Sequence, residues 1–473
     1  MPDNALFGPL FGSPEVDRET GERAWLQALL DVERSLAAAQ ARAGLMPGSA
    51  ARAIAACCLA GRFDAVSIGR RGLAAGNPVV PLVADLTALV PAEAARYVHN
   101  GATSQDILDT ATMLVTRRAL GPILADLRTA AGRCAELAEQ AADTVMAGRT
   151  LLQQAAPITF GLKCAGWLTA LDEAADGLDF VCGSRLAVEF GGAVGTLASA
   201  GEAGLTVMAA MADDLHLAEP VLPWHTNRTR VAQAGCALAV ASGSLAKIAL
   251  DVVLLAQTEV AEAGEAGGPG RGGSSTLPHK RNPVGAVLVT ACTRRVPGLA
   301  ATLLAAMAQE HERAAGGWHA EWETLTEALR LTGGAARHGR EMLAGLRFDA
   351  ARMRGNLGVA NGLIMAESVA TRLSTALGRA AANDLVTRVS ADAAARGTPL
   401  RDALLAEPAV TAHLTAAEVD AALDPASYLG SAGRFVSRAL ARHASVTARA
   451  RPTGQQDGQQ DGQQDGQQDG QRR

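Results

Sequence analysis

The sequence has few aromatic residues, which make up 3% of the chain, and few runs of β-branched residues. Hydrophobic residues nevertheless account for 48% of its 473 residues, so alanine and leucine must fill most of the core. Alanine and leucine are among the strongest helix formers. We therefore expect an all-α protein, long enough for several domains of ordinary size around a large buried core.

Several classes of protein are disfavoured by what the sequence lacks. No cluster of lysine and arginine is interleaved with aromatic residues, and the net charge is −5, so nucleic acid is not an expected partner. The seven cysteines have no Cys-x-x-Cys spacing, which indicates reduced core thiols rather than disulfides or zinc ligands. No P-loop sequence occurs, and no pattern of histidines or carboxylates predicts a metal site.

Targeting and membrane-spanning signals are also missing. Residues 1–18 lack a basic segment followed by an apolar one, so we expect no signal peptide. The most apolar long stretch, residues 236–260, contains Lys247, Asp251 and Glu259, which a spanning helix would bury at considerable cost. We expect a cytoplasmic protein with no membrane partner, in which this stretch lies inside a helical bundle.

Hydrophobic periodicity predicts a small helical domain followed by a bundle of long helices. Helical patterns at residues 23–43 and 49–60 predict an N-terminal helical domain over residues 1–105. Four long Ala-, Leu- and Val-rich segments follow, at residues 106–145, 158–180, 229–263 and 284–312. They predict a central long-helix bundle over residues 106–355. Such Ala-rich helices can also pack against another subunit, which favours an oligomer.

The last part of the chain changes in character. Shorter helical patterns predict a C-terminal helical domain over residues 356–453, with helices at 364–377, 380–395, 400–407 and 416–423. Residues 454–473 consist mostly of Gln-Gln-Asp-Gly repeats without an apolar residue. We expect this low-complexity tail to be disordered.

Residues 264–283, called the signature loop below, join a glycine-rich run to the polar segment Gly-Ser-Ser-Thr-Leu-Pro-His-Lys-Arg-Asn-Pro. Lys280 supplies a compact positive charge, Asn282 an amide donor, and Ser274 and Ser275 hydroxyls that can donate or exchange a proton. The glycines give the flexibility of a closing lid. A solvated Gly/Ser linker is the alternative, and the Pro-x-Lys-x-Asn-Pro continuation argues against it. The pattern predicts a loop that closes over an anionic substrate.

Gly268, Gly270 and Gly273 also satisfy the Gly-x-Gly-x-x-Gly spacing of dinucleotide sites. That motif functions between a strand and a helix, whereas here Ala-rich helical sequence precedes it and Pro269 interrupts it. We therefore reject a nucleotide site.

A second polar run, His-Asn-Gly-Ala-Thr-Ser-Gln-Asp at residues 99–106, precedes a long helical pattern. Thr103 or Ser104 before a helix is usually an N-cap. A helix N-terminus that carries Thr103, Ser104 and Gln105 is nonetheless a suitable site for a carboxylate. This run is called the first motif below.

The segment Gly-Arg-Thr-Leu-Leu-Gln-Gln-Ala-Ala-Pro at residues 148–157 is the second motif. It resembles the Gly-Arg-Thr-His-x-Gln motif of the fumarase/aspartase superfamily, whose first motif is similar to residues 99–106. The signature loop resembles the superfamily signature Gly-Ser-Ser-x-Met-Pro-x-Lys-x-Asn-Pro. Leu277 replaces the usual methionine there, which is a swap of similar volume. The resemblance extends over about residues 6 to 450.

Two departures from the superfamily pattern lie at catalytic positions. Leu151 stands where many members have a catalytic histidine, and Val287 where they often have its glutamate partner. Loss of both indicates a site for another reaction, because either polar group alone would be stranded at a cost of about 1–3 kcal/mol. The branch that lacks the histidine is that of the bacterial 3-carboxy-cis,cis-muconate cycloisomerases. Residues 6–11, 223–228 and 310–322 look similar to that branch as well.

The resemblance implies an L-aspartase-like three-domain fold with a long central helical bundle. It also implies a homotetramer whose active sites combine motifs of different subunits. The implied reaction converts 3-carboxy-cis,cis-muconate to a carboxymuconolactone in protocatechuate catabolism, without a cofactor. One substrate carboxylate attacks the double bond while a proton reaches the carbon next to another carboxylate.

The resemblance also assigns roles to the polar residues. Lys280 and Asn282 would stabilise the enolate-like dianion, for which cationic and amide donors are needed. Ser274 matches the superfamily's catalytic serine and would deliver the proton, with His99 as its main competitor. The predicted substrate-binding residues are Thr103, Ser104, Gln105, Arg149, Thr150, Gln153, Ser275 and Asn282.

Other interpretations stay open at this point. Three histidines and three tryptophans can be functional or structural: His225, His311, His319, Trp224, Trp318 and Trp322. Within the superfamily, the alternative function is a lyase that releases fumarate from a succinylated amine. Outside it, the alternative is a non-catalytic helical scaffold.

Overall fold

The computed structural model describes residues 6–266, 272–273 and 276–450. Helices make up most of these residues, and their only strands form two short two-stranded sheets. The all-α prediction is therefore confirmed as a fold class. Some predictions lie outside the described residues: those for Ser274 and Ser275, for two glycines of the rejected nucleotide motif, and for the tail at residues 454–473.

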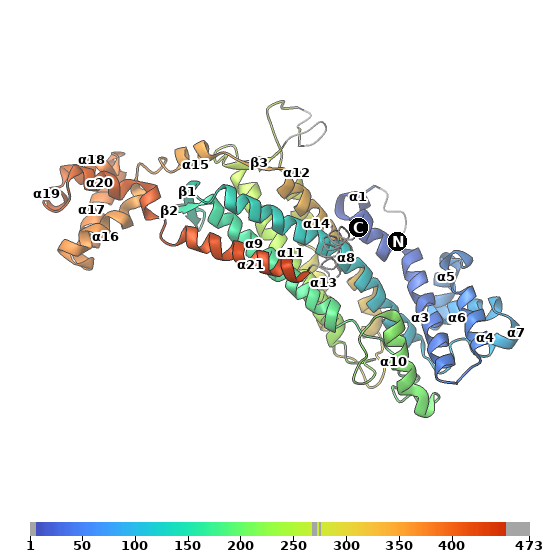
Figure 1. Cartoon of the computed structure of the whole chain (residues 1–473). Helices are drawn as coiled ribbons and strands as arrows, with labels where there is room; N and C mark the ends of the chain where they lie inside the picture. The colour runs from blue at the N-terminus through green and yellow to red at the C-terminus, as the bar shows by residue number, and fades with distance from the viewer. Residues whose placement is uncertain (1–5, 267–271, 274–275, 451–473) are drawn as a thin grey trace, which may run out of the picture.

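Long helices run side by side in an elongated central bundle (Figure 1). The long ones are α8 (Ser104–Gln140), α9 (Phe160–Ser184), α11 (Thr229–Leu255) and α14 (Gly317–Ala344), and the shorter α12 (Val284–Thr293) and α13 (Val296–Ala305) pack against α11 and α14. Helix α8 has 37 residues and is therefore about 55 Å long at a rise of 1.5 Å per residue. One hydrophobic core joins the bundle to α3 (Glu22–Arg42).

Most of the N-terminal helices gather at one end of the bundle, whereas α1 (Gly8–Phe11) lies beside α12 and α14 (Figure 1). Besides α1 and α3, the N-terminal helices are α2 (Pro14–Thr20), α4 (Gly48–Cys57), α5 (Ala65–Ala75), α6 (Val79–Leu89) and α7 (Ala92–Ala95). Helix α10 (Gly204–Leu215) packs on α3 at the same end. The short 3-10 helices of the chain are η1 (Ala60–Arg62), η2 (Gly201–Ala203), η3 (Leu363–Met365) and η4 (Pro425–Tyr428).

A smaller helical group with its own hydrophobic core lies at the opposite end (Figure 1). It contains α16 (Ala366–Leu377), α17 (Arg379–Arg396), α18 (Leu400–Ala406), α19 (Pro408–Thr411) and α20 (Ala416–Leu423), and α15 (Ala350–Asn356) leads into it. Helix α21 (Ala432–Ala450) then returns along α9, where Nδ1 of His443 lies 2.9 Å from the Asp172 carboxylate. The domain boundaries that the sequence suggests stay a prediction.

One helix prediction needs correction, and one long helix was not predicted. The predicted single helix at 284–312 is wrong, because α12 ends at Thr293 and α13 begins at Val296, with Pro297 in its first turn. Helix α14 does not figure among the predicted long segments, since its sequence contains the helix-weakening pair Gly333 and Gly334. These glycines permit close packing: a Cβ on Gly334 would lie 2.1 Å from the carbonyl oxygen of Phe11.

The strands hold the functional loops in place. Strands β1 (Val145–Thr150) and β2 (Gln153–Thr159) form an antiparallel hairpin just beyond the end of α8. Strands β3 (Ala263–Glu265) and β4 (Leu346–Phe348) pair antiparallel, and β3 leads directly into the signature loop. The second motif is therefore a hairpin rather than part of a helix.

Candidate active site

The first motif begins with a turn in an uncommon backbone conformation. His99 has a φ of 56° and Gly101 a φ of 73°, in the left-handed region that non-glycine residues rarely adopt. Helix α3 holds this turn at two points. Nδ1 of His99 lies 2.6 Å from Oε1 of Glu33, and the side-chain amide of Gln40 donates to the Asn100 carbonyl at 2.6 Å.

The rest of the first motif starts helix α8. Thr103 is the N-cap residue, and its backbone N–H donates to the Asp106 carboxylate at 3.0 Å. Thr103 and Ser104 are half-buried at the positive end of a long helix dipole, where a carboxylate would be stabilised. The capping interpretation and the binding interpretation are thus compatible at these two residues.

Gln105 is buried, and protein groups surround its amide. Its NH₂ donates to Asp109 at 3.1 Å and to the His225 carbonyl at 2.8 Å, while its oxygen accepts from Nε of Arg313 at 3.1 Å. The geometry favours a role for Gln105 in placing the Arg313 guanidinium rather than in direct contact with a substrate. Arg313 also donates to the carbonyl of Ala193 at 2.9 Å.

A buried acid and histidine cluster lies behind this helix end. Nε2 of His225 donates to Asp106 at 2.7 Å and lies 3.5 Å from Oε1 of Glu189. Burial, followed by the nearby Asp106 and Asp109 charges, raises the pKa of Glu189 well above its ordinary value. His225 is therefore a structural partner of Asp106.

The same three side chains offer one ligand atom each within 4.8 Å, a geometry that could hold a metal ion. Their hydrogen bonds account for them better. The Asp106 carboxylate already accepts the backbone N–H groups of Gly191 at 3.0 Å and Gly192 at 2.9 Å. Two ligands of a tetrahedral zinc ion are about 3.3 Å apart, further than the His225–Asp106 distance.

A second buried network fixes α8 to α11 and α14. The Arg228 guanidinium donates to Asp109 at 2.7 and 2.9 Å and to Glu321 at 2.6 Å. The Trp318 indole N–H donates to Asp109 at 2.9 Å, and Arg228 lies over the Trp224 ring. These two tryptophans are buried core anchors, as one of the two sequence interpretations predicted.

The second motif presents its turn to solvent. Leu151 and Leu152 occupy the hairpin turn with φ values of 50° and 65°, and they are 96% and 73% exposed. Two leucines in this strained conformation and this exposure are unusual for a free hairpin. Thr150 and Gln153 pair beside them at the ends of the two strands.

Arg149 points away from that turn and into the protein. Its guanidinium donates to both carboxylate oxygens of Glu262, at 2.8 and 2.7 Å, and the Glu262 side chain is fully buried. The Asn356 amide donates to the same carboxylate at 2.8 Å. Arg149 therefore anchors the hairpin to the base of the signature loop, and its predicted role in substrate orientation would be indirect.

The described part of the signature loop is closed at its base. The Asn282 backbone N–H donates to the Gly272 carbonyl at 2.8 Å. The Glu265 carboxylate accepts the N–H groups of Gly285 at 2.9 Å and Ala286 at 2.8 Å, at the start of α12. Asn282 thus belongs to the first of these contacts, Lys280 lies within the loop that this contact closes, and Val287 on α12 is 53% exposed.

The described residues of the first motif lie far from those of the other two motifs within one chain. The first motif lies at the start of α8, and the second follows its end, about 55 Å away. Arg149 and Glu265 place the second motif and the base of the signature loop at the same end of the bundle. Among the described residues, one chain therefore keeps the first motif apart from the second motif and from the base of the signature loop.

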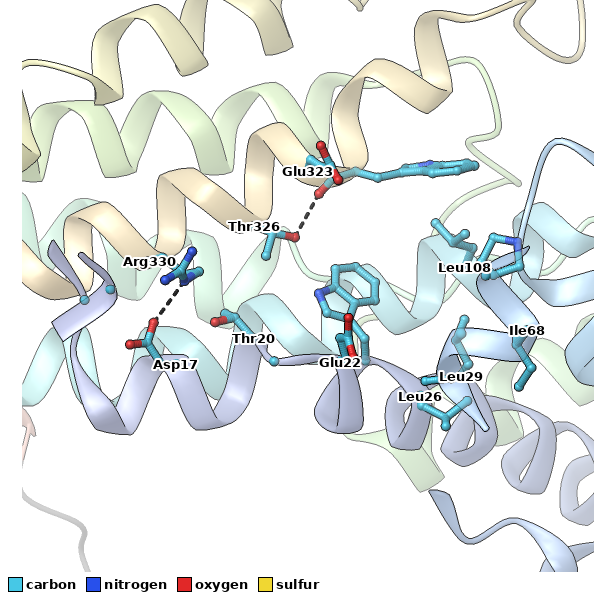
Figure 2. Close-up of a pocket in the computed structure, with 18 of the residues that line it drawn as sticks. Asp17, Thr20, Glu22, Leu26, Leu29, Ile68, Leu108, Glu323, Thr326 and Arg330 are labelled. Atoms are coloured by element: carbon cyan, nitrogen blue, oxygen red, sulfur yellow. Dashed lines mark hydrogen bonds and ion pairs between the residues drawn. The ribbon is translucent and has the colours of Figure 1, made fainter. Parts of the chain in front are cut away.

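A large cavity lies elsewhere, between α1, α2, α3, α5 and α14, with a volume of about 890 Å³. Figure 2 shows Asp17 and Arg330 turned toward each other at one end and Leu26, Leu29 and Ile68 at the other. No residue of the three motifs is among the described residues that line it. Its wall carries the carboxylates of Asp17, Glu22 and Glu323 against the guanidinium groups of Arg330 and Arg337, so it offers a polycarboxylate no excess of positive charge.

Sequence reasoning overlooked Glu33 as a partner of His99. The signal was present, because Glu33 lies between Leu29 and Leu36 on the apolar face of the predicted helix at 23–43. A carboxylate on a buried face needs a partner. No local pattern pointed to Glu189 or Glu262, whose partners are distant in the sequence.

Comparison with known proteins gives consistent matches. A family described as lyase matches residues 16–298, and the adenylosuccinate lyase C-terminus family matches residues 362–439. The 3-carboxy-cis,cis-muconate cycloisomerase of Pseudomonas aeruginosa is 46% identical over 446 residues, which are 94% of this chain and 97% of that protein. The nitrosuccinate lyase of Streptomyces davaonensis is 47% identical over 449 residues, which are 93% of this chain and 94% of that protein.

A solved structure agrees with these matches. The 3-carboxy-cis,cis-muconate lactonizing enzyme of Pseudomonas putida has a TM-score of 0.88 and 44% identity, covering 94% of this chain and 100% of that chain. The resemblance that the three motifs suggested is confirmed, as is the predicted L-aspartase-like bundle. The chain belongs to the fumarase/aspartase superfamily of lyases and is similar to its bacterial 3-carboxy-cis,cis-muconate cycloisomerases.

Proposed function

We propose that the protein converts 3-carboxy-cis,cis-muconate to a carboxymuconolactone. Cycloisomerases of this substrate are 40–46% identical to it over nearly their whole length. The observation that carries the proposal is the second motif, where Leu151 and Leu152 form an apolar turn in place of the histidine that superfamily lyases use. A site with this turn has no imidazole there to assist an eliminating group.

The remaining polar residues suit lactonisation. An oxygen of one substrate carboxylate bonds to a carbon of the double bond, and the displaced electron pair accumulates next to another carboxylate. Lys280 and Asn282 would stabilise that enolate-like anion. A proton then forms the new C–H bond. The substrate trianion thus gains one proton and becomes a lactone dianion, and neither metal nor redox chemistry is needed for this balance.

We propose that His99 delivers the proton to the substrate and that Ser274 binds the anion. A free serine is a poor acid, whereas an imidazole beside a carboxylate can be protonated near neutral pH. The assignment predicts that His99→Asn abolishes turnover at every pH, while Ser274→Ala raises KM and keeps a measurable kcat. The opposite pattern would instead identify Ser274 as the residue that delivers the proton. Steady-state kinetics of the two variants decide between them.

We also propose that the active site forms between subunits of a homotetramer. Family members act on small carboxylates and are typically oligomeric. Only 44% of the most apolar stretch of α11 is buried within one chain, and Phe180, Val240 and Leu250 are exposed on α9 and α11. Such a face requires cover. The stretch is also long enough to cross a membrane, but it carries Lys247 and Asp251, and we propose a cytoplasmic protein.

Mixed oligomers test this arrangement. Co-expression of His99→Asn chains with Lys280→Ala chains should restore about a quarter of the wild-type activity, because a random tetramer regenerates about that share of intact sites. The control pairs Lys280→Ala with Asn282→Ala, which lie in one loop and cannot complement. Activity that stays absent in the first mixture, with mixed tetramers present, would place both residues in the same chain's site.

A second candidate is the elimination of nitrite from nitrosuccinate to give fumarate. It is favoured by the nitrosuccinate lyase relative at 47% identity. Elimination of a good leaving group does not require the missing histidine either. One preparation should be assayed for loss of carboxymuconate absorbance and for appearance of fumarate from nitrosuccinate, adenylosuccinate and argininosuccinate. A kcat/KM at least a hundredfold higher for carboxymuconate supports the proposal, and the reverse ratio replaces it with the lyase.

A further inference from the structure

Glu33 is an unusual residue for the interior of a helical bundle. It lies on α3 among buried apolar neighbours and is only 2% exposed. An isolated carboxylate in such a place would be strongly destabilising, and the charge needs a partner. Its partner is His99, at 2.6 Å between Oε1 and Nδ1.

The His99 turn is built to receive this carboxylate. His99 holds a left-handed φ of 56°, which costs free energy unless the surroundings compensate. Gln40 lies two helical turns beyond Glu33 on α3. Its side-chain amide donates to the carbonyl of Asn100, the residue after His99, and so helps to hold this backbone conformation. Both contacts come from the same face of α3, so this helix fixes the position of the imidazole.

The hydrogen bond also decides which ring nitrogen carries a proton. An ionised carboxylate only accepts, so Nδ1 must donate to Glu33. Nε2 is then the nitrogen left for a substrate, and it has no hydrogen-bond partner among the described side chains. Burial lowers the pKa of His99, but the Glu33 charge and hydrogen bond, with the Asp106 charge from α8, together raise it above its ordinary value.

We propose that Glu33 is a positioning residue that holds His99 in the orientation and protonation state from which Nε2 delivers the proton to the substrate. This inference rests on the proposed function. In the step, the Nε2–H bond breaks as the C–H bond forms at the enolate-like carbon, and His99 is left neutral. Water then returns a proton to Nε2, so each lactone carries one solvent proton.

The test is Glu33→Gln, which keeps the volume and can still accept from Nδ1–H but has no charge. Because activity requires protonated His99, kcat/KM is lost as pH rises through the His99 pKa. Glu33→Gln should move this alkaline limb of the pH profile to lower pH. Its kcat/KM should then be about tenfold or more below that of the wild type at pH 8 but within about threefold of it at pH 6. Gln40→Leu is the matched control, because it loosens the same turn without changing charge and should leave the limb in place.

A second measurement separates this proposal from the proposed function. The His99 ring can be titrated by NMR in protein labelled at the histidine Cε1, with His99→Asn used only to assign its resonance. Glu33→Gln should lower the titration midpoint even if the substrate proves to be a different one. Equal midpoints, or pH profiles that coincide after scaling, would reduce Glu33 to a structural residue and overturn the proposal.

Discussion

Replacing Glu262 with glutamine should release the second motif from the base of the signature loop. Glu262 is fully buried and accepts two hydrogen bonds from Arg149, at 2.8 and 2.7 Å, and one from Asn356 at 2.8 Å. Glutamine keeps the shape and one acceptor but removes the charge. The Arg149 side chain is 23% exposed, so water can solvate part of the orphaned guanidinium.

The magnitude follows from that geometry. Breaking a buried ion pair by removing one partner costs about 3–5 kcal/mol. Partial exposure of Arg149 and the remaining amide acceptor reduce the expected cost to about 2–3 kcal/mol. Since only the hairpin and its neighbours depend on the pair, the loss should appear as local opening of β1 and β2 rather than as global unfolding.

Amide hydrogen exchange of the hairpin measures this local free energy. A double-mutant cycle with Arg149→Met should give a coupling energy of about 2 kcal/mol, because the second substitution removes a group that the first has already stranded. Asp420→Asn is the control: its pair with Arg401 is about half exposed, so this substitution should leave stability and hydrogen exchange close to those of the wild type. Additive effects of Glu262→Gln and Arg149→Met would refute the anchor and favour direct contact of Arg149 with the substrate.

Three further predictions concern the interior. Glu189→Gln should raise Tm more at pH 8 than at pH 5. Because the folded pKa of Glu189 is raised, folding must keep it protonated, a penalty that is absent below its unfolded pKa and grows as pH rises toward the folded pKa. Equal gains at both pH values would contradict this. Gly334→Ala should cost about 1–3 kcal/mol, since its Cβ would lie 2.1 Å from the Phe11 carbonyl, whereas Gly298→Ala on α13 meets open space and should not destabilise. Thermal melts compare the two variants, and equal Tm values would show that the backbone at Phe11 can shift to admit the added Cβ at little cost. Burial raises the pKa of the Cys58 thiol to about 12, so a disulfide reagent at pH 8 should not modify this thiol before the protein unfolds. Mass spectrometry of the native protein after treatment with the reagent checks this. Fast labelling of Cys58 would show that the thiol is not buried.

Fold class and family were predictable because the signals are local. Scarce aromatics, abundant alanine and leucine and few breakers specify helices without reference to partners. The motifs likewise keep their chemistry in short stretches, as at Lys280 and Asn282. Helix α14 was harder, since Gly333 and Gly334 weaken a helix in isolation and are favourable only against Val16 and Phe11.

The site was less predictable because its contacts are long-range. Arg149 looked like a substrate ligand, and only the fold shows that its charge is directed at Glu262, which lies 113 residues later. Gln105 was likewise predicted to bind substrate, and only the fold shows that Asp109, the His225 carbonyl and Arg313 surround its amide. A local sequence pattern does not indicate which buried carboxylate a side chain will contact in the folded protein. By contrast, the polar run itself identified the turn that carries His99.

The most direct test of the central claim is the product formed from 3-carboxy-cis,cis-muconate by the purified protein in D₂O, followed by NMR. We predict a carboxymuconolactone that carries one deuterium on the carbon next to a carboxylate, formed without added metal or nucleotide. Unchanged substrate in the presence of folded, oligomeric protein would contradict the account, and fumarate formed from nitrosuccinate by the same sample would identify the chain as a lyase instead.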